Sequence, residues 1–205
     1  MALLSDRDSL RWHSLGERLS ESVEPLLHPG VLANRSLADA VDRGRLRPSL
    51  RRARRAVRVM AARSEAVILT DVRSFYPSVS PSVAFRALQN IGVEPDAASE
   101  VASMLDGWGS EGYEGLPIGP PASAIMANAV LAPMDAELTS MPFLRWVDDY
   151  AVSLNDTRRV PEVLERFDAT LDRSGLGRAV PKTRVLGRGD AFGWLGTYGR
   201  ADPSE

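Results

Sequence analysis

The chain has 205 residues, of which 44% are hydrophobic, and its 25 basic and 27 acidic side chains leave a net charge of −2. This length and composition allow one domain with a substantial core and exclude a disordered or low-complexity protein. The absence of cysteine excludes a disulfide scaffold, a zinc ribbon and a thiol nucleophile, and only His13 and His28 could supply imidazole ligands.

The first segment is predicted to be an amphipathic helix. Between residues 8 and 27, Leu15, Leu19 and Val23 recur at helical spacing, and the HPG stretch at 28–30 ends the pattern. The N-terminus has no basic segment followed by an apolar run, and no window approaches the roughly 18 apolar residues of a membrane span. We therefore expect a cytoplasmic protein without a membrane partner.

An arginine-rich segment follows at residues 43–64. It holds nine arginines and no acid, whereas the rest of the chain has 16 basic and 27 acidic residues, a net charge of −11. Its second half is predicted to form a helix with a strongly basic face. Such a face can simply be solvated, but uncompensated arginines repel one another, so an anion such as nucleic acid is the favoured partner. The candidate contacts are Arg51, Arg52, Arg54, Arg55 and Arg58.

The middle of the chain begins with a buried strand and continues with helices. The apolar run at 66–70 predicts a strand that ends at Asp71, and helices are expected at 82–90 and 97–105. A glycine-rich loop at 107–119 should lead into a long helix at 121–138. This part places one aspartate at the end of an apolar strand.

The last part predicts a hairpin, a helix and two strands. Asp148 and Asp149 separate two apolar runs, FLRWV and YAVSL, which is the pattern of a tight hairpin. A helix is expected at about 161–174, and GRAVPKTRVLG and FGWLGTY read as strands. The order of elements indicates an α+β fold, a mostly antiparallel sheet with helices on one face and no linker between domains.

Three carboxylates are therefore expected at one edge of the sheet. Asp71, Asp148 and Asp149 could each be a turn residue, but neighbouring central strands would bring all three together. Carboxylates held that close repel unless a cation lies between them. Oxygen ligands without histidine or cysteine favour Mg²⁺ or Mn²⁺, and two such ions can activate a 3′-hydroxyl and stabilise a pyrophosphate leaving group.

Five motifs in this order resemble those of reverse transcriptases. ILTDVRSFYPSV is similar to polymerase motif A, GLPIGPPAS to motif B and FLRWVDDYAVSL to motif C. VPKTRVL resembles motif D with its lysine, and FGWLGTY resembles motif E. Motif B is most similar to that of bacterial abortive-infection and phage-defence reverse transcriptases. The resemblance implies a polymerase palm over residues 65–205, preceded by a reduced, fingers-like segment over residues 1–64.

The resemblance also implies roles for the acidic residues and the lysine. Asp71 and Asp148 would bind two Mg²⁺ ions (Mn²⁺ being an alternative), the backbone carbonyl of Val72 would complete one shell, and Asp149 would be a weaker third carboxylate. Lys182, the only lysine of the chain, would be the general acid for departing pyrophosphate. A general acid must release its proton, which arginine practically cannot do.

The remaining implied roles concern the substrate. Tyr76 would lie under the sugar of the incoming nucleotide and exclude a 2′-hydroxyl, with Phe75 beside it, although one of the two must be a core aromatic. Gly119 and Ser123 would form a small-residue floor for the new base pair. Arg73 and Arg35 would contact the triphosphate of the deoxynucleotide.

The implied partners are an RNA template, a primer with its DNA product, and deoxynucleoside triphosphates. The sequence stops seven residues after Tyr198, with no evident thumb, so a protein or RNA partner is expected to replace one. Two other functions stay open. A catalytically silent palm that binds nucleic acid or a protein would not need the intact aspartates and Lys182. A nucleotidyl cyclase would need a glycine pair before the hairpin acids, where this chain has Arg145 to Val147.

Overall fold

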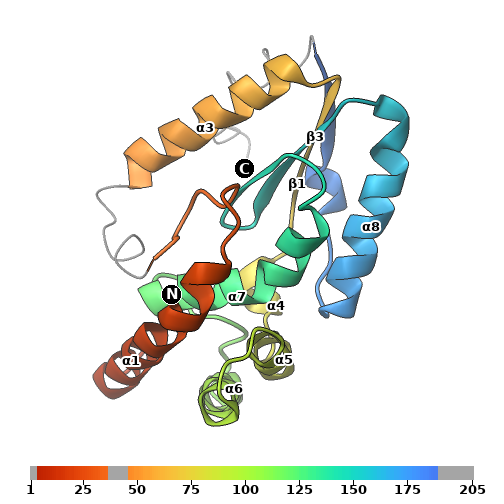
Figure 1. Cartoon of the computed structure of the whole chain (residues 1–205). Helices are drawn as coiled ribbons and strands as arrows, with labels where there is room; N and C mark the ends of the chain where they lie inside the picture. Colours follow the sequence, from red (N-terminus) through yellow and green to blue (C-terminus); the bar gives the residue numbers. More distant parts are fainter. Residues whose placement is uncertain (1–3, 37–45, 189–205) are drawn as a thin grey trace, which may run out of the picture.

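The computed structural model describes residues 4–36 and 46–188, and the side chains of residues 46–51 lie outside that description. The elements are α1 (Asp6–Val23), η1 (Glu24–Leu26), α3 (Leu46–Arg63), β1 (Ala66–Asp71), α4 (Phe75–Ser78), α5 (Pro81–Asn90), α6 (Pro95–Ser110), α7 (Pro121–Glu137), β2 (Phe143–Trp146), β3 (Asp149–Leu154), η3 (Thr157–Arg159), α8 (Val160–Arg173), η4 (Val180–Lys182) and β4 (Arg184–Gly187). The four strands form one antiparallel sheet in the order β2-β3-β1-β4 (Figure 1). The predicted α+β palm is confirmed.

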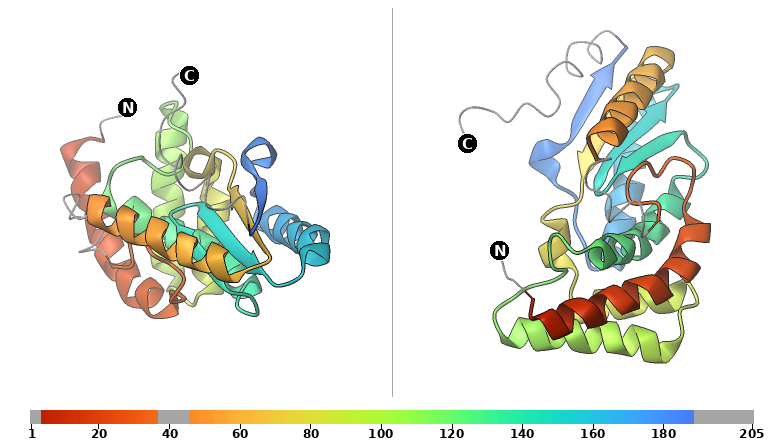
Figure 2. Two further views of the ribbon diagram at one scale, coloured as in Figure 1. Left: turned by 90° about the horizontal axis from the view of Figure 1, so that it is seen from above. Right: turned by 90° about the vertical axis from the view of Figure 1, so that its left-hand side faces the viewer.

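Strand β1 is the centre of the molecule, and all six of its residues are buried. Its Ile68 side packs with Ile125 of α7 and Phe167 of α8 in the main core, as expected for helices covering one face of the sheet. Its Val67 side packs under Ala61 of α3, which lies across the opposite face (Figure 2). A strand covered on both faces needs apolar residues at every position, which explains the uninterrupted run that predicted it.

Helix α1 lies against the motif B helix α7 and shares its core. Leu15, Leu19 and Val23 form its buried stripe, and Ser5 caps it by accepting a hydrogen bond from the Asp8 amide. The indole nitrogen of Trp12 donates to the Ser123 hydroxyl at 2.9 Å. The first helix therefore supports the element that precedes the hairpin.

Two predicted boundaries were wrong. The glycine-rich loop was expected from residue 107, but α6 continues through Gly107 and Gly109 to Ser110, because Met104, Leu105 and Trp108 bury its inner face and outweigh the low helix propensity of glycine. The segment GRAVPKTRVLG was expected to be one strand. Only Arg184–Gly187 is a strand, and Val180–Lys182 forms a 3₁₀ turn whose proline cannot donate to a sheet ladder. The FGWLGTY strand of motif E lies outside the described residues.

The search for a membrane-spanning helix covered the described residues. Within residues 4–36 and 46–188, no helix combines the length and the apolar character needed to cross a bilayer.

Candidate active site

The sheet register brings the predicted aspartates to the same end of two neighbouring strands. Asp71, the last residue of β1, is the Cα partner of Asp149, the first residue of β3. Trp146 of β2 also pairs with Asp149, so the hairpin turn consists of Val147 and Asp148. The prediction that both aspartates form the turn was wrong by one residue. Only Asp148 lies in the turn, and Asp149 is already part of the sheet.

The hairpin turn has a strained backbone. Val147 has a φ of +59°, in the left-handed region that β-branched residues avoid. A conformation of this kind persists only where neighbouring groups hold it, and it is typical of functional sites. The residue that follows Val147 is Asp148, the candidate metal ligand.

Lys182 binds the aspartate of β1. Its ammonium Nζ lies 2.7 Å from Asp71 Oδ2 and donates a hydrogen bond to it, although the two residues are 111 positions apart in sequence. This hydrogen bond and the charge of Asp71 raise the pKa of Lys182. The backbone supports the pair, because the Ala179 amide donates to the Asp71 carbonyl at 2.8 Å. The turn at Val180–Lys182 thus places the lysine directly over β1.

Asp148 and Tyr76 share a partly buried environment. Burial raises the pKa of Asp148, and the negative charge of Asp71 raises it further. Burial and then the charge of Asp148 raise the pKa of Tyr76 to about 12. Two carboxylates that lie close enough for one to raise the pKa of the other, in a partly buried site, are a typical setting for a divalent cation.

The residues present fit a cation at Asp71 and Asp148. Asp71 Oδ1 is buried and has no hydrogen-bond partner among the residues that the structure describes, and such an oxygen is a natural metal ligand. The carbonyl of Val72 also faces the hairpin, because the bonds to the 177–179 segment are made by its neighbours Asp71 and Arg73.

The predicted cluster of three carboxylates is not assembled. Within the described ranges, no three His, Cys, Asp or Glu side chains converge closely enough to hold a metal ion. Asp149 belongs to a strand and Asp148 to a turn, so their carboxylates leave the backbone in different directions. Lys182 already places one positive charge on Asp71.

Comparisons with known proteins agree with this geometry. The family model described as "Reverse transcriptase (RNA-dependent DNA polymerase)" matches residues 17–198. The chain belongs to the reverse transcriptase family. Reverse transcriptases are nucleotidyltransferases. The matched range includes all five motifs identified in the sequence. The comparison with curated proteins finds no match.

Solved structures with the same fold include two telomerases. Apo telomerase from Candida tropicalis superposes with a TM-score of 0.59 at 12% identity, over 86% of this chain and 37% of that chain. Telomerase from Candida albicans, in complex with a TWJ fragment of telomeric RNA, gives a TM-score of 0.55 at 11% identity, over 85% and 34%. The chain spans about a third of the length of these reverse transcriptases, and the likeness shows the fold.

Two residues expected to touch substrate are buried in the structure. Ser123 is fully buried and accepts the hydrogen bond from Trp12, so it faces α1 instead of a substrate cleft. Phe75 is buried in the main core, which makes it the core aromatic of the pair and leaves Tyr76 half-buried beside the aspartates. Gly119, by contrast, is exposed at a φ of +119°, a conformation that suits glycine.

The two arginines expected at the triphosphate differ in their contacts. Arg35 donates to the backbone carbonyls of Leu27, His28 and Val31, so its guanidinium stabilises the loop after η1 instead of facing the aspartates. Arg73 is exposed at the end of β1, beside Gly177, and stays a candidate for the triphosphate.

The second half of the arginine-rich segment is helical, as predicted, because it lies within α3, and this helix presents a basic face. Arg52, Arg55 and Arg58 are exposed on α3. Arg54 is half-buried, and its Nε atom has no hydrogen-bond partner within the described part of the chain. The side chain of Arg51 lies outside the described residues. The apolar face of α3 packs on the sheet, which leaves Arg52, Arg55 and Arg58 toward solvent.

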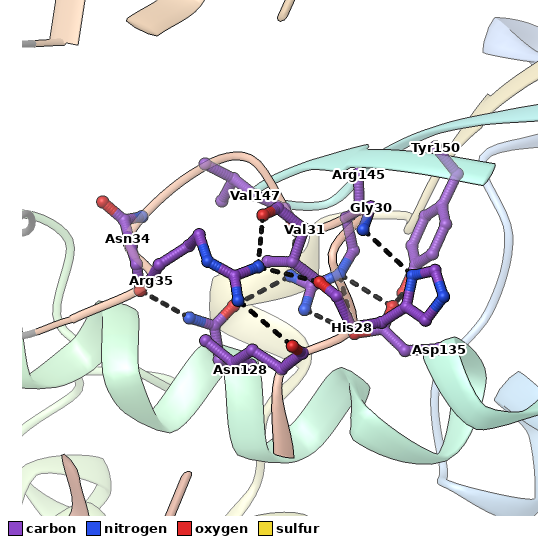
Figure 3. Close-up of polar contacts among 11 residues, drawn as sticks. His28, Gly30, Val31, Asn34, Arg35, Asn128, Asp135, Arg145, Val147 and Tyr150 are labelled. Atoms are coloured by element: carbon purple, nitrogen blue, oxygen red, sulfur yellow. Dashed lines mark hydrogen bonds and ion pairs between the residues drawn. The ribbon is translucent and has the colours of Figure 1, made fainter. Parts of the chain in front are cut away.

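Sequence reasoning missed a buried polar network behind the hairpin. Arg145 of β2 is fully buried and bonds to Asp135 and Asn128 of α7 (Figure 3). A signal was present, because an aspartate and an arginine interrupt two apolar segments, and a charge in such a segment needs a partner.

The raised pKa of Asp148 predicts a stability difference that depends on pH. A carboxyl group whose pKa is raised in the folded state favours folding below its ordinary pKa of 3.8, and this contribution is lost as the pH rises through the raised pKa. In chelator at pH 7, Asp148→Asn should therefore unfold at a higher urea concentration than the wild type, and the gap should close toward about pH 3.

Asp156→Asn serves as the control of opposite sign, because Arg158 lowers the pKa of Asp156. That variant should not be stabilised at pH 7. Added Mg²⁺ should stabilise the wild type and leave Asp148→Asn unchanged, since only the former keeps the ligand. An Asp148→Asn variant less stable than the wild type at pH 7 in chelator would contradict the assignment.

Proposed function

We propose that this chain is an RNA-directed DNA polymerase that adds deoxynucleotides to a 3′-hydroxyl. The observation that carries the proposal is the juxtaposition of Asp71, the last residue of β1, with Asp148 in the turn before the neighbouring strand β3, and Lys182 is held against Asp71. Membership of the reverse transcriptase family supports it. We further propose that residues 1–64 act as fingers and residues 65–205 as palm.

Asp71, Asp148 and the Val72 carbonyl would hold Mg²⁺ or Mn²⁺. When bound, two such ions lower the pKa of the primer hydroxyl and neutralise charge on the leaving pyrophosphate. Lys182 would leave Asp71 and donate a proton to the leaving group. It is the only lysine of the chain, and an ammonium can release its proton, which a guanidinium practically cannot do.

The other site residues would bind and orient the substrate. Tyr76, beside Asp148, would pack under the sugar and exclude a 2′-hydroxyl. Arg73 would contact the triphosphate, and the exposed arginines of α3 would bind the phosphates of template and primer, with strong salt dependence. The backbone of Gly119 would lie close to the new base pair.

A primer-extension assay tests the proposal. The protein would be given a primed RNA template, each deoxynucleotide or ribonucleotide, and Mg²⁺ or Mn²⁺, beside Asp148→Asn. We expect template-directed incorporation of deoxynucleotides by the wild type alone. Equal incorporation by the variant, or none under any condition, would contradict polymerase activity.

A second candidate is a catalytically silent palm that binds nucleic acid or a protein. The observation that favours it is the ion pair of Lys182 with Asp71, which satisfies one ligand without a metal. This candidate predicts nucleic-acid binding with no incorporation in the same assay. A role in phage defence rests on the resemblance of GLPIGPPAS alone, and it would be tested by phage plating on cells that carry the wild type or Asp148→Asn.

A further inference from the structure

The hairpin turn needs an external support. Val147 is β-branched and has a φ of +59°, so its own conformational preference opposes the geometry that presents Asp148. A two-residue turn offers few contacts of its own. The carbonyl of Val147 belongs to the same peptide unit as the Asp148 amide, and the group that binds this carbonyl therefore fixes the orientation of that peptide.

Arg145 is the group that binds this carbonyl. Its Nη1 donates to the Val147 carbonyl at 2.8 Å and to Asn128 Oδ1 at 2.9 Å (Figure 3). The side chain is fully buried, so water does not compete for these hydrogen bonds. One guanidinium nitrogen thus joins the strained turn to helix α7.

The other side of the guanidinium is anchored to Asp135. Nε and Nη2 of Arg145 donate to the two carboxylate oxygens of Asp135, at 2.9 Å and 2.6 Å. The Tyr150 hydroxyl donates to the same carboxylate at 3.0 Å, and both residues are buried. Asp135 therefore ties α7 to both strands of the hairpin.

A second layer lies behind this network. The backbone of Arg145 pairs with the segment after η1, its amide donating to the Gly30 carbonyl and its carbonyl accepting from the Leu32 amide. Asn128 Nδ2 donates to the Asn34 carbonyl at 2.7 Å. The position of Arg145 is thus set by α7, by the hairpin and by the 30–34 segment together (Figure 3).

We propose that Arg145 is a positioning residue for catalysis, which holds the Val147–Asp148 peptide in the orientation that brings the Asp148 carboxylate beside Asp71. The inference rests on the proposed function, because it concerns the metal affinity of that site. Lysine cannot replace this arginine. Its ammonium is a single point of charge, whereas the planar guanidinium donates to Asp135, Asn128 and Val147 at once.

The test compares Arg145→Lys with Arg166→Lys, a matched change in the half-exposed pair of Arg166 with Glu137. Mn²⁺ affinity is measured by electron paramagnetic resonance, and amide hydrogen exchange is measured at residues 147–149. Arg145→Lys should bind Mn²⁺ about 10- to 100-fold more weakly than the wild type, because this is the usual loss of metal affinity when a group that orients a metal ligand is replaced. Its turn amides should exchange faster, and Arg166→Lys should match the wild type in both measurements.

Two further variants separate positioning from general stability. Arg145→Met combined with Asp135→Leu replaces the buried pair by apolar groups, which usually preserves folding, yet removes the donor to Val147. It should lose Mn²⁺ affinity as Arg145→Lys does. Adding Val147→Gly to Arg145→Lys should recover part of the affinity, because glycine adopts a positive φ without steric cost.

Wild-type affinity and unchanged exchange in the folded Arg145 variants would overturn the inference, as would a failure of Val147→Gly to recover any affinity. Asp148→Asn distinguishes the two proposals. If it binds Mn²⁺ as the wild type does, the proposed metal site is wrong. The positioning role of Arg145 is then decided by hydrogen exchange alone, where faster exchange in Arg145→Lys supports it and equal exchange overturns it.

Discussion

Replacing Asp71 with asparagine is expected to lower deoxynucleotide incorporation by about 10³-fold, because a metal ligand at the reacting centre contributes several kcal/mol of transition-state stabilisation. The same change should leave the free energy of unfolding within about 1 kcal/mol of the wild type. The substitution removes the ion pair with Lys182, whose side chain is 72% exposed, and ion pairs with an exposed partner contribute little to stability. Asparagine also removes a buried charge that has one unpartnered oxygen.

Single-turnover extension of a primed RNA template measures the first effect, and urea unfolding in chelator measures the second. Asp172→Asn, on the exposed side of α8, is the matched control and should keep both properties. The combination of lost activity with retained stability is what separates a catalytic aspartate from a structural one. Wild-type incorporation by Asp71→Asn would contradict the role of Asp71 in metal binding.

The largest loss of stability is expected from Asp135→Asn. Arg145 has no exposed side-chain surface and Asp135 only 6%, so asparagine leaves a guanidinium buried without its counter-charge. Removing one partner of a buried ion pair costs about 3–5 kcal/mol. Urea unfolding measures the change in the free energy of unfolding, which should appear as a lower midpoint with a similar slope.

Glu137→Gln provides the comparison within the same helix. Glu137 pairs with Arg166 at 2.6 Å, but both side chains are partly exposed, so its loss should cost at most about 1 kcal/mol. The double variant Arg145→Met with Asp135→Leu should regain part of the stability that Asp135→Asn loses, because it removes the buried charge but leaves the Tyr150 hydroxyl and Asn128 Oδ1 without these partners. If Asp135→Asn costs no more than Glu137→Gln, the network does not stabilise the hairpin.

The strand that carries Asp71 and the hairpin that carries Asp148 could be predicted because their patterns are local. β1 is buried on both faces and reads as an uninterrupted apolar run, and two apolar runs around paired aspartates read as a hairpin. The family motifs lie on these elements. Lys182 could be singled out as the only lysine of the chain, although its contact with Asp71 depends on the pairing of distant segments.

The remainder depended on tertiary packing. The length of α6 was underestimated because glycine propensity says nothing of the apolar face that Trp108 and Leu105 bury. Ser123 reads equally well as a substrate contact or a core hydroxyl until Trp12 is placed beside it. The strain at Val147 could not be predicted from the sequence, since a left-handed turn position favours glycine, asparagine or aspartate and β-branched valine is rare there.

The hydrogen bond between Trp12 and Ser123 joins residues 111 positions apart, and this has a consequence for synthesis on the ribosome. Helix α1 is translated before α7, and its apolar stripe is buried against α7 only when that later helix has been made. The stripe is therefore without its native cover while the intervening residues are translated, at about 5–20 residues per second. During those seconds we expect the uncovered stripe of α1 to be a point at which chaperones can bind the nascent chain.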